Sequence, residues 1–472
     1  MDISRSNKFN KLLKLVTLGL LIIVSCSKED RPTPISTIPD RSLPNIKPKG
    51  NEKYLQKNSD YVYDQEKIRT YELIIKSEDL AEINADPAAE KYVEGALIFE
   101  GDTISPVGVR YKGSLGAFAG CLSNPDWGHP AGQKTCEKLS MQVKINWNGR
   151  KERFFDLNKL QFHSQNYDKS QLRERLAYWI FAEMGVRSPR SVHARLLINN
   201  TYSGLYGLTE EIDNRFAEYF YKEGKGNIYK EVWPVKANGE LQSDKAFIDA
   251  LKTNEEEQDI NLIKEFGQAI AASNASTGKD VVRKYMNVNE IMSYIVVDRA
   301  IRHDDGPFHW YCDDEMVNSC ASKNFYWFED KKNRKMHFIP WDMDGTFEQM
   351  ITGANLYTGI ADKWGETSNN CEPFTYWSGQ KQRSAACDKL TAAWVSFGQE
   401  YNSIGSDFRN NFVVNNKIIF QFEKWAKQIE PFIIEADNFH NKGITNAANK
   451  KATTVFVWEK AVNALRSQIN AM

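Results

Sequence analysis

Two aspartates, Asp342 and Asp344, stand two positions apart directly after the apolar-rich run 338–341. If the backbone stays extended there, both carboxylates point to the same face. Two like charges held that close repel, and one takes up a proton unless a cation lies between them. Hard oxygen ligands on one face favour Mg²⁺, Mn²⁺ or Ca²⁺. The spacing therefore indicates a divalent-metal site; the alternative is a turn at Gly345 with one capping and one solvated aspartate.

Two polar residues upstream extend this pattern. Asp305 lies in a Gly/Pro turn after a predicted helix, and Asn324 lies at the start of the predicted strand 323–328. In kinase-like phosphotransfer, one aspartate orients the acceptor hydroxyl, an asparagine soon after it binds metal, and an aspartate on the next hairpin also binds metal. The order Asp305, Asn324, Asp342 follows that scheme. The first gap exceeds the D-x-x-x-x-N spacing of protein kinases, but the segment from Cys312 to Cys320 reads as a stapled insertion, and excising roughly a dozen residues there would bring the gap near that spacing.

Two other features invite a functional interpretation. Arg110 and Lys112 precede the Gly/Ser stretch 113–116, whose backbone N–H groups would suit phosphate oxygens. The stretch matches neither the Walker loop nor GxGxxG, and a surface turn is the plainer interpretation. His303, near the end of a predicted helix, would serve as a base or, more commonly for a lone histidine, as a structural side chain.

Taken together, these motifs resemble the spore-coat protein H (CotH) kinase family. The resemblance runs in order through about 65–472, and its most specific part is the Pro-Trp-Asp-x-Asp run. The residues that carry it are 109–114, 172–173, Asn200, 204–206, 211–213, 226–230, 305–306, 324–326 and 339–344.

The resemblance implies a phosphotransferase that uses ATP and Mg²⁺ or Mn²⁺. It makes Asp305 the catalytic-loop aspartate, Asn324 and Asp342 metal ligands, and Asp344 a further candidate ligand. The sequence departs from the family in three cysteine-bearing insertions, two of which flank the expected site. The acceptor is therefore open between a protein and another hydroxyl-bearing molecule such as a glycan.

The phosphate-binding lysine is open between two candidates. Lys138 and Lys144 share one face of the predicted strand 138–145, and the position of Lys138 fits the family pattern better. Arg110 would steady a phosphate or pair with an acidic neighbour. Glu211 would meet a lysine or the nucleotide, or simply face solvent at the start of a helix.

The elements that must position these residues change character along the chain. The fold class we expect is α+β, and the family resemblance implies an atypical protein-kinase-like, two-lobed form: an antiparallel-sheet lobe at about 65–235 with one main helix, then a mainly helical lobe at about 240–472. An Asp168/Gln171 capping box is predicted to begin the main helix. The predicted strands are 69–75, 92–99, 104–111, 138–145, 191–198, 203–209, 226–230, 323–328 and 335–341.

The N-terminal segment has the features of an export signal. Four basic residues precede the apolar run 15–24, which is short for a membrane span. The run ends in a lipobox-like Ile-Val-Ser-Cys that implies cleavage after residue 25 and lipidation of Cys26. The Pro-rich segment 26–60 reads as a flexible tether, and 61–472 as the kinase-like domain. We therefore expect an outer-membrane lipoprotein, surface-exposed or facing the periplasm, that meets the membrane through its lipid only.

Charge and cysteine content narrow the function classes. Removing residues 1–25 takes away four basic residues and one acidic residue, which shifts the net charge from −1 to −4, so nucleic acid is not an expected partner. Apart from the lipidated Cys26, six cysteines remain, and in an exported protein an even number predicts disulfides. Six cysteines allow 15 connectivities; we expect pairing between sequence neighbours: Cys121–Cys136, Cys312–Cys320 and Cys371–Cys387.

Two other functions compete with phosphotransfer. A non-catalytic surface protein that keeps a kinase-like fold for adhesion or glycan capture would suit the envelope, where ATP is scarce. A glycosyltransferase would use Asp342 and Asp344 as its D-x-D, but the first half lacks the strand–helix alternation expected of that class. The expected partners are thus a nucleotide and an unknown protein or glycan acceptor.

Overall fold

A computed structural model gives the fold and describes residues 52–472 apart from 114, 119, 125, 127–128, 222–223, 304, 315, 317–318, 348–370, 378–379 and 447–450. The expected signal peptide, Cys26, the tether up to residue 51 and Ser114 of the candidate phosphate loop lie outside the described residues. Helices and strands both contribute substantially, so the α+β class is confirmed. Within the described ranges, every helix is too short or too polar to cross a membrane.

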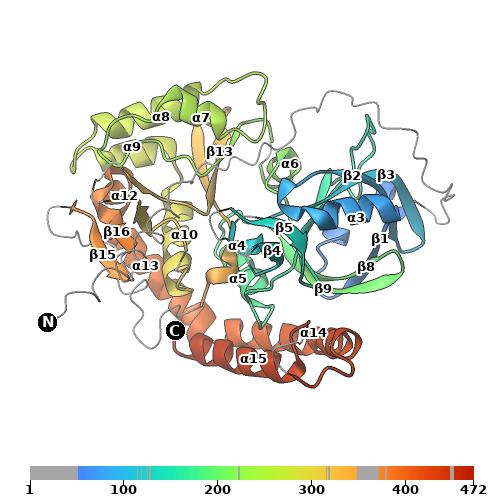
Figure 1. Ribbon diagram of the computed structural model, residues 1–472. Coiled ribbons are helices and arrows are strands. Elements are labelled where there is room, and N and C mark those ends of the chain that lie inside the picture. The colour runs from blue at the N-terminus through green and yellow to red at the C-terminus, as the bar shows by residue number, and fades with distance from the viewer. Residues whose placement is uncertain are drawn as a thin grey trace, which may run out of the picture.

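The first half of the body is a closed barrel (Figure 1). Neighbouring strands are antiparallel except β1 and β8, which close the barrel in parallel. The predicted antiparallel sheet is thus corrected to a barrel with one parallel seam. Alternate side chains fill its interior, as the period of two requires. In barrel order the strands are β1 (Arg69–Ile75), β2 (Val93–Phe99), β3 (Asp102–Tyr111), β6 (Met141–Lys144), β7 (Lys159–His163), β9 (Thr201–Thr209) and β8 (Ser191–Ile198).

The chain packs against the barrel earlier than composition predicts. The backbone N–H groups of Glu52 and Lys53 donate to the Asp102 carboxylate, and Tyr54 is buried. Residues 52–54 are therefore already packed against the barrel, although the predicted tether extends to about residue 60. The short elements around the barrel are α2 (Lys53–Gln56), the 3-10 turns Ser59–Tyr61 and Pro87–Ala89, α3 (Ser77–Ala85), α4 (Leu115–Phe118), β4 (Leu122–Asn124) and β5 (Ala131–Lys134).

The main helix of the first half, α5 (Arg173–Glu183), is buried along most of its length. The predicted capping box is wrong, because Gln171 has a left-handed backbone and lies outside the helix. Asp168 still serves the helix start: its carboxylate accepts from the backbone N–H of Arg173 at 2.9 Å. A helix buried on several sides touches both halves of the molecule, which suits it to position a site between them.

The second half is mainly helical. It contains a small sheet of order β10-β13-β14, so the strand at Ile228–Lys230 pairs with Phe325–Asp330 rather than with the barrel. This corrects the predicted boundary near 235–240, because the second half already begins before residue 228. The elements are α6 (Asn214–Phe220), β10 (Ile228–Lys230), α7 (Asp244–Asp249), α8 (Asn261–Ala272), α9 (Gly278–Tyr285), α10 (Val288–Ala300), β13 (Phe325–Asp330), β14 (Lys335–Pro340), a 3-10 turn (Met343–Gly345), α12 (Lys389–Val395), α13 (Gly398–Phe408), a π-helical segment (Arg409–Val414), α14 (Lys417–His440) and α15 (Val455–Asn470).

The two insertions that flank the expected site form one sheet. Its order is β12-β11-β16-β15, so strands from the two insertions pair directly. All three predicted disulfides are confirmed: Cys121–Cys136, Cys312–Cys320 and Cys371–Cys387. The elements of this sheet are β11 (Trp310–Cys312), β12 (Cys320–Ala321), β15 (Phe374–Trp377) and β16 (Gln380–Arg383), followed by the 3-10 turn Ala385–Cys387.

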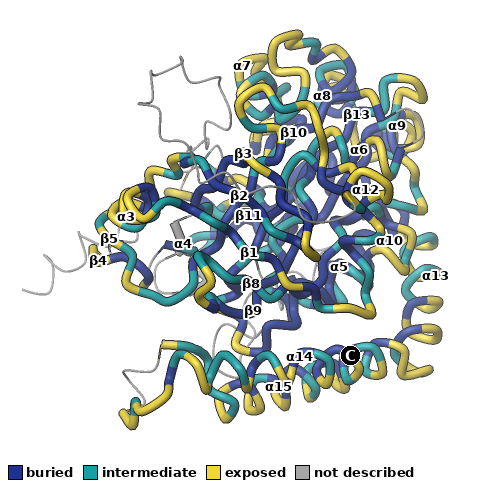
Figure 2. The backbone as a smooth tube through the Cα atoms, turned by 90° about the vertical axis from the view of Figure 1, so that its right-hand side faces the viewer, coloured by how far each residue is buried: buried dark blue, intermediate teal, exposed yellow. Residues whose placement is uncertain are grey.

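The helices α14 and α15 pack side by side beneath the barrel (Figure 1). Arg195 of β8 pairs with Glu435 of α14, and the indole N–H of Trp458 in α15 donates to the Ser170 carbonyl at 3.1 Å. Their outward turns are exposed and their inward turns buried (Figure 2). The C-terminal helices therefore return to the barrel half and tie the two halves together.

Candidate active site

The aspartate pair does not lie on an extended backbone. Strand β14 ends at Pro340, Asp342 adopts a left-handed conformation (φ 59°, ψ 62°), and Met343–Gly345 forms a 3-10 turn. The prediction that both carboxylates share the face of a strand is therefore wrong in its geometry. Both aspartates are nonetheless partly buried and close enough to influence each other's titration. We call residues 342–346 the acid turn.

Two side chains hold the backbone of the acid turn in place. The Tyr178 hydroxyl of α5 accepts from the backbone N–H of Asp342 at 3.2 Å. His303 Nε2 lies 3.1 Å from the Asp342 carbonyl, and its Nδ1 lies 3.0 Å from the Asp298 carboxylate. Burial alone would lower the pKa of His303, but Asp298 outweighs it and raises that pKa. The buried His303, held at both ring nitrogens, is therefore a structural brace for the turn rather than a catalytic base.

Asp305 and Asn324 meet across the stapled insertion. The side-chain nitrogen of Asn324 lies 2.8 Å from both the carboxylate and the carbonyl of Asp305. Lys323 Nζ lies 2.8 Å from the other carboxylate oxygen of Asp305. A Cβ on Gly345 would stand 3.8 Å from that of Asp305, so the acid turn is directly beside it. With its nitrogen committed to Asp305, Asn324 has its amide oxygen left for other partners.

Several carboxylates crowd together in this cluster. Removal from water raises the pKa of Asp342, and the carboxylates of Asp305 and Glu174 raise it further. Burial and then Asp342 raise the pKa of Asp344 well above its usual range. Lys323 lies within the same field: burial would lower its pKa, but Asp305 and Asp342 raise it. The cluster is thus short of positive charge, a condition that a bound cation relieves.

A lysine outside the predicted set reaches this cluster from the barrel. Lys112 follows β3, and its ammonium lies 3.2 Å from Nε2 of His163 and 5.5 Å from the centre of the Trp341 ring. His163 Nδ1 in turn lies 2.8 Å from the carboxylate of Glu174 on α5. Burial would raise the pKa of Glu174, but His163 and Lys112 outweigh it and lower that pKa. Lys112, His163 and Glu174 form a chain that ends beside Asp342.

The structure places the predicted lysines elsewhere. Lys138 precedes β6 instead of sharing its face, and its ammonium contacts the Leu205 carbonyl at 2.6 Å and the Gln171 side chain at 3.4 Å. Burial lowers the pKa of Lys138 to about 7, so the amine is only partly charged at neutral pH. Lys144 lies at the end of β6, with its ammonium 5.9 Å from the Tyr92 ring.

The two other predicted phosphate or nucleotide contacts are engaged within the barrel wall. Arg110 pairs with Glu90 and donates to the Gln142 side chain at 3.2 Å. Glu211 accepts from the Gln142 side chain at 3.1 Å, and its carboxylate lies 3.6 Å from the ammonium of Lys159. Of the alternatives that the sequence left open, the acidic partner for Arg110 and the lysine partner for Glu211 are the ones found.

Sequence reasoning passed over Lys112, His163 and Glu174 as site residues. Lys112 was visible only as part of a Gly/Ser stretch that matched no phosphate loop. His163 does carry a local signal, because it alternates with the buried Phe162 on β7 and therefore faces outward from the barrel. Glu174 carries none, since a glutamate in the first turn of a helix is ordinary.

The donor set fits a small hard cation. Across the described residues, no three His, Cys, Asp or Glu side chains are arranged to hold a metal by themselves. Mg²⁺, however, commonly takes one or two carboxylates and completes its shell with water and substrate phosphates. The carboxylates of Asp342 and Asp344 and the amide oxygen of Asn324 supply that chemistry, in a cluster whose crowded charge favours a cation.

Comparison with known proteins gives one match. The model of a family described as CotH kinase protein matches residues 109–471, which include the whole acid turn, Asp305, Asn324 and the Lys112 chain. No curated protein matches the chain.

Proposed function

The chain belongs to the CotH kinase protein family, and from that premise we propose that it is a metal- and ATP-dependent phosphotransferase at the cell envelope. Its acceptor is a hydroxyl group on a protein or a glycan. The observation that supports this most directly is the meeting of Asp305, Asn324 and the acid turn, which come from three separate segments of the chain.

Two residues of the site act on the substrates directly. Asp305, half-exposed and beside Lys323, receives the proton of the acceptor hydroxyl. Lys112, oriented by His163 and Glu174, binds the phosphates of ATP. Lys112 replaces Lys138 in this role because a buried amine with a pKa near 7 is a weak partner for phosphate.

Asn324, Asp342 and Asp344 would hold Mg²⁺ or Mn²⁺. When bound, the metal neutralises charge on the phosphates of ATP. The protein's own contribution is to fix these oxygens: His303 and Tyr178 set the backbone of Asp342, and the side chain of Asn324 is anchored on Asp305.

The same proposal includes the architecture and the location. The barrel and the helical half act as the two lobes of a kinase-like fold, with nucleotide bound between them. Residues 1–25 direct export, Cys26 carries the lipid, and 26–51 form the tether of an outer-membrane lipoprotein, surface-exposed or facing the periplasm. The lipobox-like run before Cys26 supports this placement.

The test is transfer of the labelled γ-phosphate of ATP to the protein itself and to a cell-envelope fraction, with Mg²⁺ or Mn²⁺. Wild type is expected to incorporate label, and Asp342→Asn to lose at least about 10²-fold in rate. The matched control is Asp407→Asn, because Asp407 is exposed on α13 and distant in sequence from the site. Equal labelling of Asp342→Asn and wild type, or no labelling with any metal, would count against phosphotransfer.

A non-catalytic binding protein is the second candidate. The observation that favours it is the sheet that the two disulfide-stapled insertions form together, since such loops suit adhesion or glycan capture. Calorimetry distinguishes the binding protein from the phosphotransferase. A non-catalytic binding protein should give no heat of binding with ATP and Mg²⁺ or Mn²⁺. A phosphotransferase should bind ATP saturably, and Lys112→Met should weaken that binding.

A further inference from the structure

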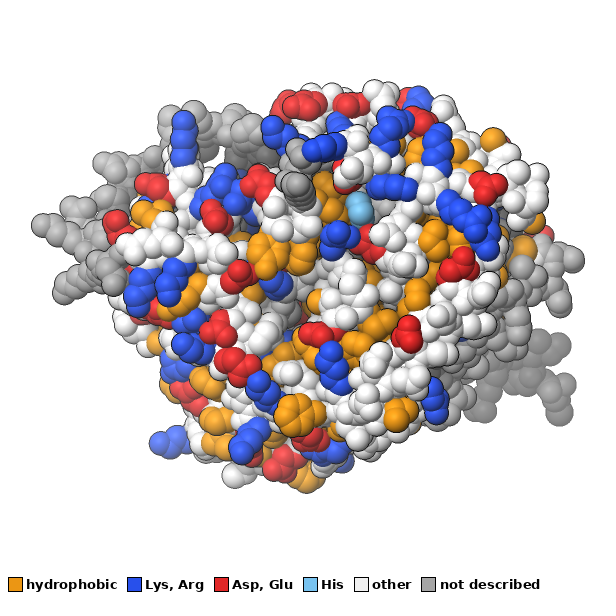
Figure 3. Space-filling model, turned by 180° about the vertical axis from the view of Figure 1, so that it is seen from behind, with side chains coloured by type: hydrophobic (Ala, Val, Ile, Leu, Met, Phe, Trp, Pro, Cys, Tyr) orange, Lys and Arg blue, Asp and Glu red, His pale blue; other side chains and the backbone are white. Residues whose placement is uncertain are grey.

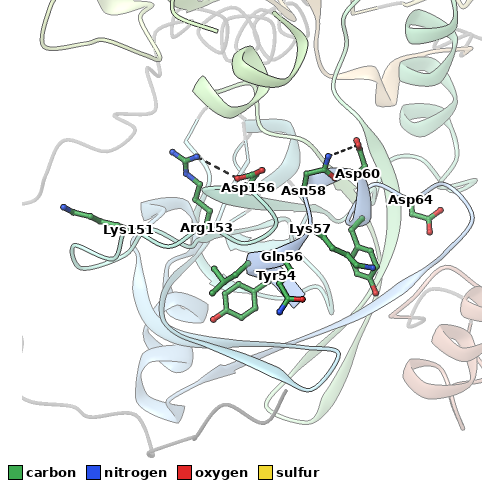
Figure 4. A pocket seen from close by; sticks show the side chains of 11 residues that line it. Tyr54, Gln56, Lys57, Asn58, Asp60, Asp64, Lys151, Arg153 and Asp156 are labelled. Carbon is green, nitrogen blue, oxygen red and sulfur yellow. Dashed lines mark hydrogen bonds and ion pairs between the residues drawn. The ribbon is translucent and has the colours of Figure 1, made fainter. Parts of the chain in front are cut away.

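Opposite charges balance in a large hollow beside the barrel, formed by residues 54–64 and the loop 151–156 (Figure 4). Three acidic and three basic side chains line it: Asp60, Asp64, Asp156, Lys57, Lys151 and Arg153. Figure 3 shows a face of the molecule on which basic and acidic side chains are likewise interspersed. The acid turn differs, because carboxylates from separate segments crowd there, and Lys323 contacts Asp305 among them.

Lys323 lies where the stapled insertion returns to the small sheet, two residues before β13. Its ammonium is 2.8 Å from one carboxylate oxygen of Asp305 and 4.8 Å from the centre of the Tyr311 ring on β11. Burial would lower the pKa of Lys323, but Asp305, and then Asp342 and Glu231, raise it. The side chain is 38% exposed, so carboxylates hold the ammonium at the boundary with solvent, where a substrate would arrive.

Asp305 accepts from two donors that differ in mobility. The amide nitrogen of Asn324 lies 2.8 Å from one carboxylate oxygen and 2.8 Å from the carbonyl of Asp305, and the backbone N–H of Asn324 donates to Glu231 at 3.0 Å. These contacts fix Asn324 in place. The ammonium of Lys323 reaches the other carboxylate oxygen from the end of a flexible stem. Of the two donors, Lys323 is therefore the one that can exchange Asp305 for another anion.

The proposed reaction brings such an anion to this position. A base holds the acceptor hydroxyl at a hydrogen-bond distance of about 3 Å, and the reacting phosphorus approaches that hydroxyl to about 3–3.5 Å. The oxygens of the transferred phosphoryl group therefore arrive beside Asp305, within the sweep of the Lys323 ammonium. Lys112 approaches the same cluster from the barrel, so the two lysines lie on different sides of it.

We propose that Lys323 is a third residue that acts on the substrates, an inference that rests on the proposed phosphotransfer. Its ammonium passes from Asp305 to the transferred phosphoryl group and stabilises the charge there through charge-assisted hydrogen bonds. In this step the bond from the γ-phosphorus to the bridging oxygen breaks, and its electron pair leaves with ADP. A bond from the same phosphorus to the acceptor oxygen forms, and the hydroxyl proton goes to Asp305. Lys323 keeps its protons throughout.

A second lysine provides a matched control at the other end of β13. Lys331 follows the strand, and its ammonium lies 2.8 Å from a carboxylate oxygen of Asp259. The two pairs are similarly exposed: 38% and 37% for Lys323 and Asp305, and 33% and 42% for Lys331 and Asp259. The six residues of β13 separate the two lysines by roughly 20 Å, at about 3.3 Å per residue. Lys331 therefore has the same kind of partner but lies outside the site.

The experiment compares wild type with Lys323→Gln, Lys323→Arg and Lys331→Gln. Glutamine keeps an N–H donor for Asp305 but has no charge, whereas arginine keeps the charge. Steady-state kinetics with labelled ATP give kcat and KM for each protein. Calorimetry measures the binding of ADP with Mg²⁺, alone and with aluminium fluoride, which mimics the transferred phosphoryl group and needs no turnover.

We expect Lys323→Gln to lower kcat about 10²-fold and to leave the KM for ATP within about threefold. Lys323→Arg should stay within about tenfold of wild type, and Lys331→Gln should match wild type. Aluminium fluoride should tighten ADP binding at least about tenfold in wild type and in Lys331→Gln, but not in Lys323→Gln. If Lys323 only held Asp305 in place, the glutamine variant would be about as active as the arginine variant.

Equal rates in Lys323→Gln and Lys323→Arg, or an equal effect of aluminium fluoride in Lys323→Gln and Lys331→Gln, overturn the role of Lys323. Label transfer by wild type would then still support phosphotransfer. A wild type that neither binds ADP nor transfers label overturns phosphotransfer itself, and the inference with it.

Discussion

The barrel wall and the acid turn use the same charged residue types in opposite ways. In the wall, Arg110 pairs with Glu90, and Glu211 lies against Lys159. In the acid turn, carboxylates from separate segments crowd together: besides burial, Asp305 and Glu174 raise the pKa of Asp342, and Asp342 raises that of Asp344. Paired charges fix a structure, whereas crowded like charges cost stability and persist where a ligand supplies the missing charge. The partners of a charged side chain, more than its type, therefore indicate its role.

The sharpest test of this comparison sets two lysines against each other. Lys112→Met removes the cation beside the acid turn and is expected to lower the phosphotransfer rate about 10²-fold. Lys138→Met removes an amine bonded to the Leu205 carbonyl and the Gln171 side chain, and is expected to keep the rate within about threefold, since losing these hydrogen bonds costs mainly stability. Steady-state kinetics with labelled ATP measure both. The comparison fails if the Lys138 variant is the slower enzyme.

A second comparison uses two of the disulfides, one beside the proposed site and one in the barrel half. Replacing Cys312 and Cys320 by serine, or Cys121 and Cys136 by serine, is expected to cost about 2–3 kcal/mol in free energy of unfolding in either case. Only the first change loosens the segment that brings Asn324 to Asp305, and a small misplacement there should slow transfer about tenfold. Urea unfolding and kinetics, measured on both double variants, separate stability from alignment. Equal rates in the two variants would show that the 312–320 staple plays no part in alignment.

A third prediction concerns pH in metal-free buffer. Because the pKa of Asp344 is raised in the folded state, the folded protein binds more protons than the unfolded one between the unfolded pKa of about 4 and the higher folded pKa. Stability is therefore lost as pH rises through the folded pKa. Asp344→Asn removes this loss and should raise the melting temperature at pH 8 by about 2 °C, with little difference at pH 4. Asp407→Asn serves as the control. If its melting temperature at pH 8 rises equally, crowded charge in the acid turn is not the cause of the gain.

The smallest effect is expected in the wall. Glu90→Gln removes the charge opposite the buried Arg110 but keeps an acceptor for the backbone N–H of Gly113, and should cost about 1 kcal/mol in unfolding free energy. Glu82→Gln breaks the exposed pair with Lys91 and should cost almost nothing. Urea denaturation resolves the two. A large loss of transfer in Glu90→Gln would mean that the wall takes part in the chemistry.

Local patterns predicted local structure well. The hairpin of β8 and β9 follows from alternation on both sides of Asn199-Asn200, and the hairpin of β13 and β14 from its aromatic run. Pairing between sequence neighbours found all three disulfides. In contrast, the parallel seam between β1 and β8 joins strands more than a hundred residues apart, and no local pattern records such a pairing.

The sequence predicted which residues come together in the site better than it predicted their geometry. The order Asp305, Asn324, Asp342 anticipated residues that the fold brings together. The left-handed backbone of Asp342 was hidden, because an apolar run before it predicts extension. The sequence weighed Lys138 against Lys144 for the phosphates and did not weigh Lys112, because spacing along one strand carries no information about which ammonium the fold buries.

One contact of α5 bears on how the protein is made. Arg173 donates both to the Thr346 carbonyl in the acid turn and to the side chain of Gln468, 295 residues downstream. During synthesis, Arg173 emerges long before that partner does. A polypeptide interrupted anywhere between the acid turn and residue 455 would contain every proposed catalytic side chain yet lack the helix that secures this arginine. Prematurely terminated products would thus be poor enzymes.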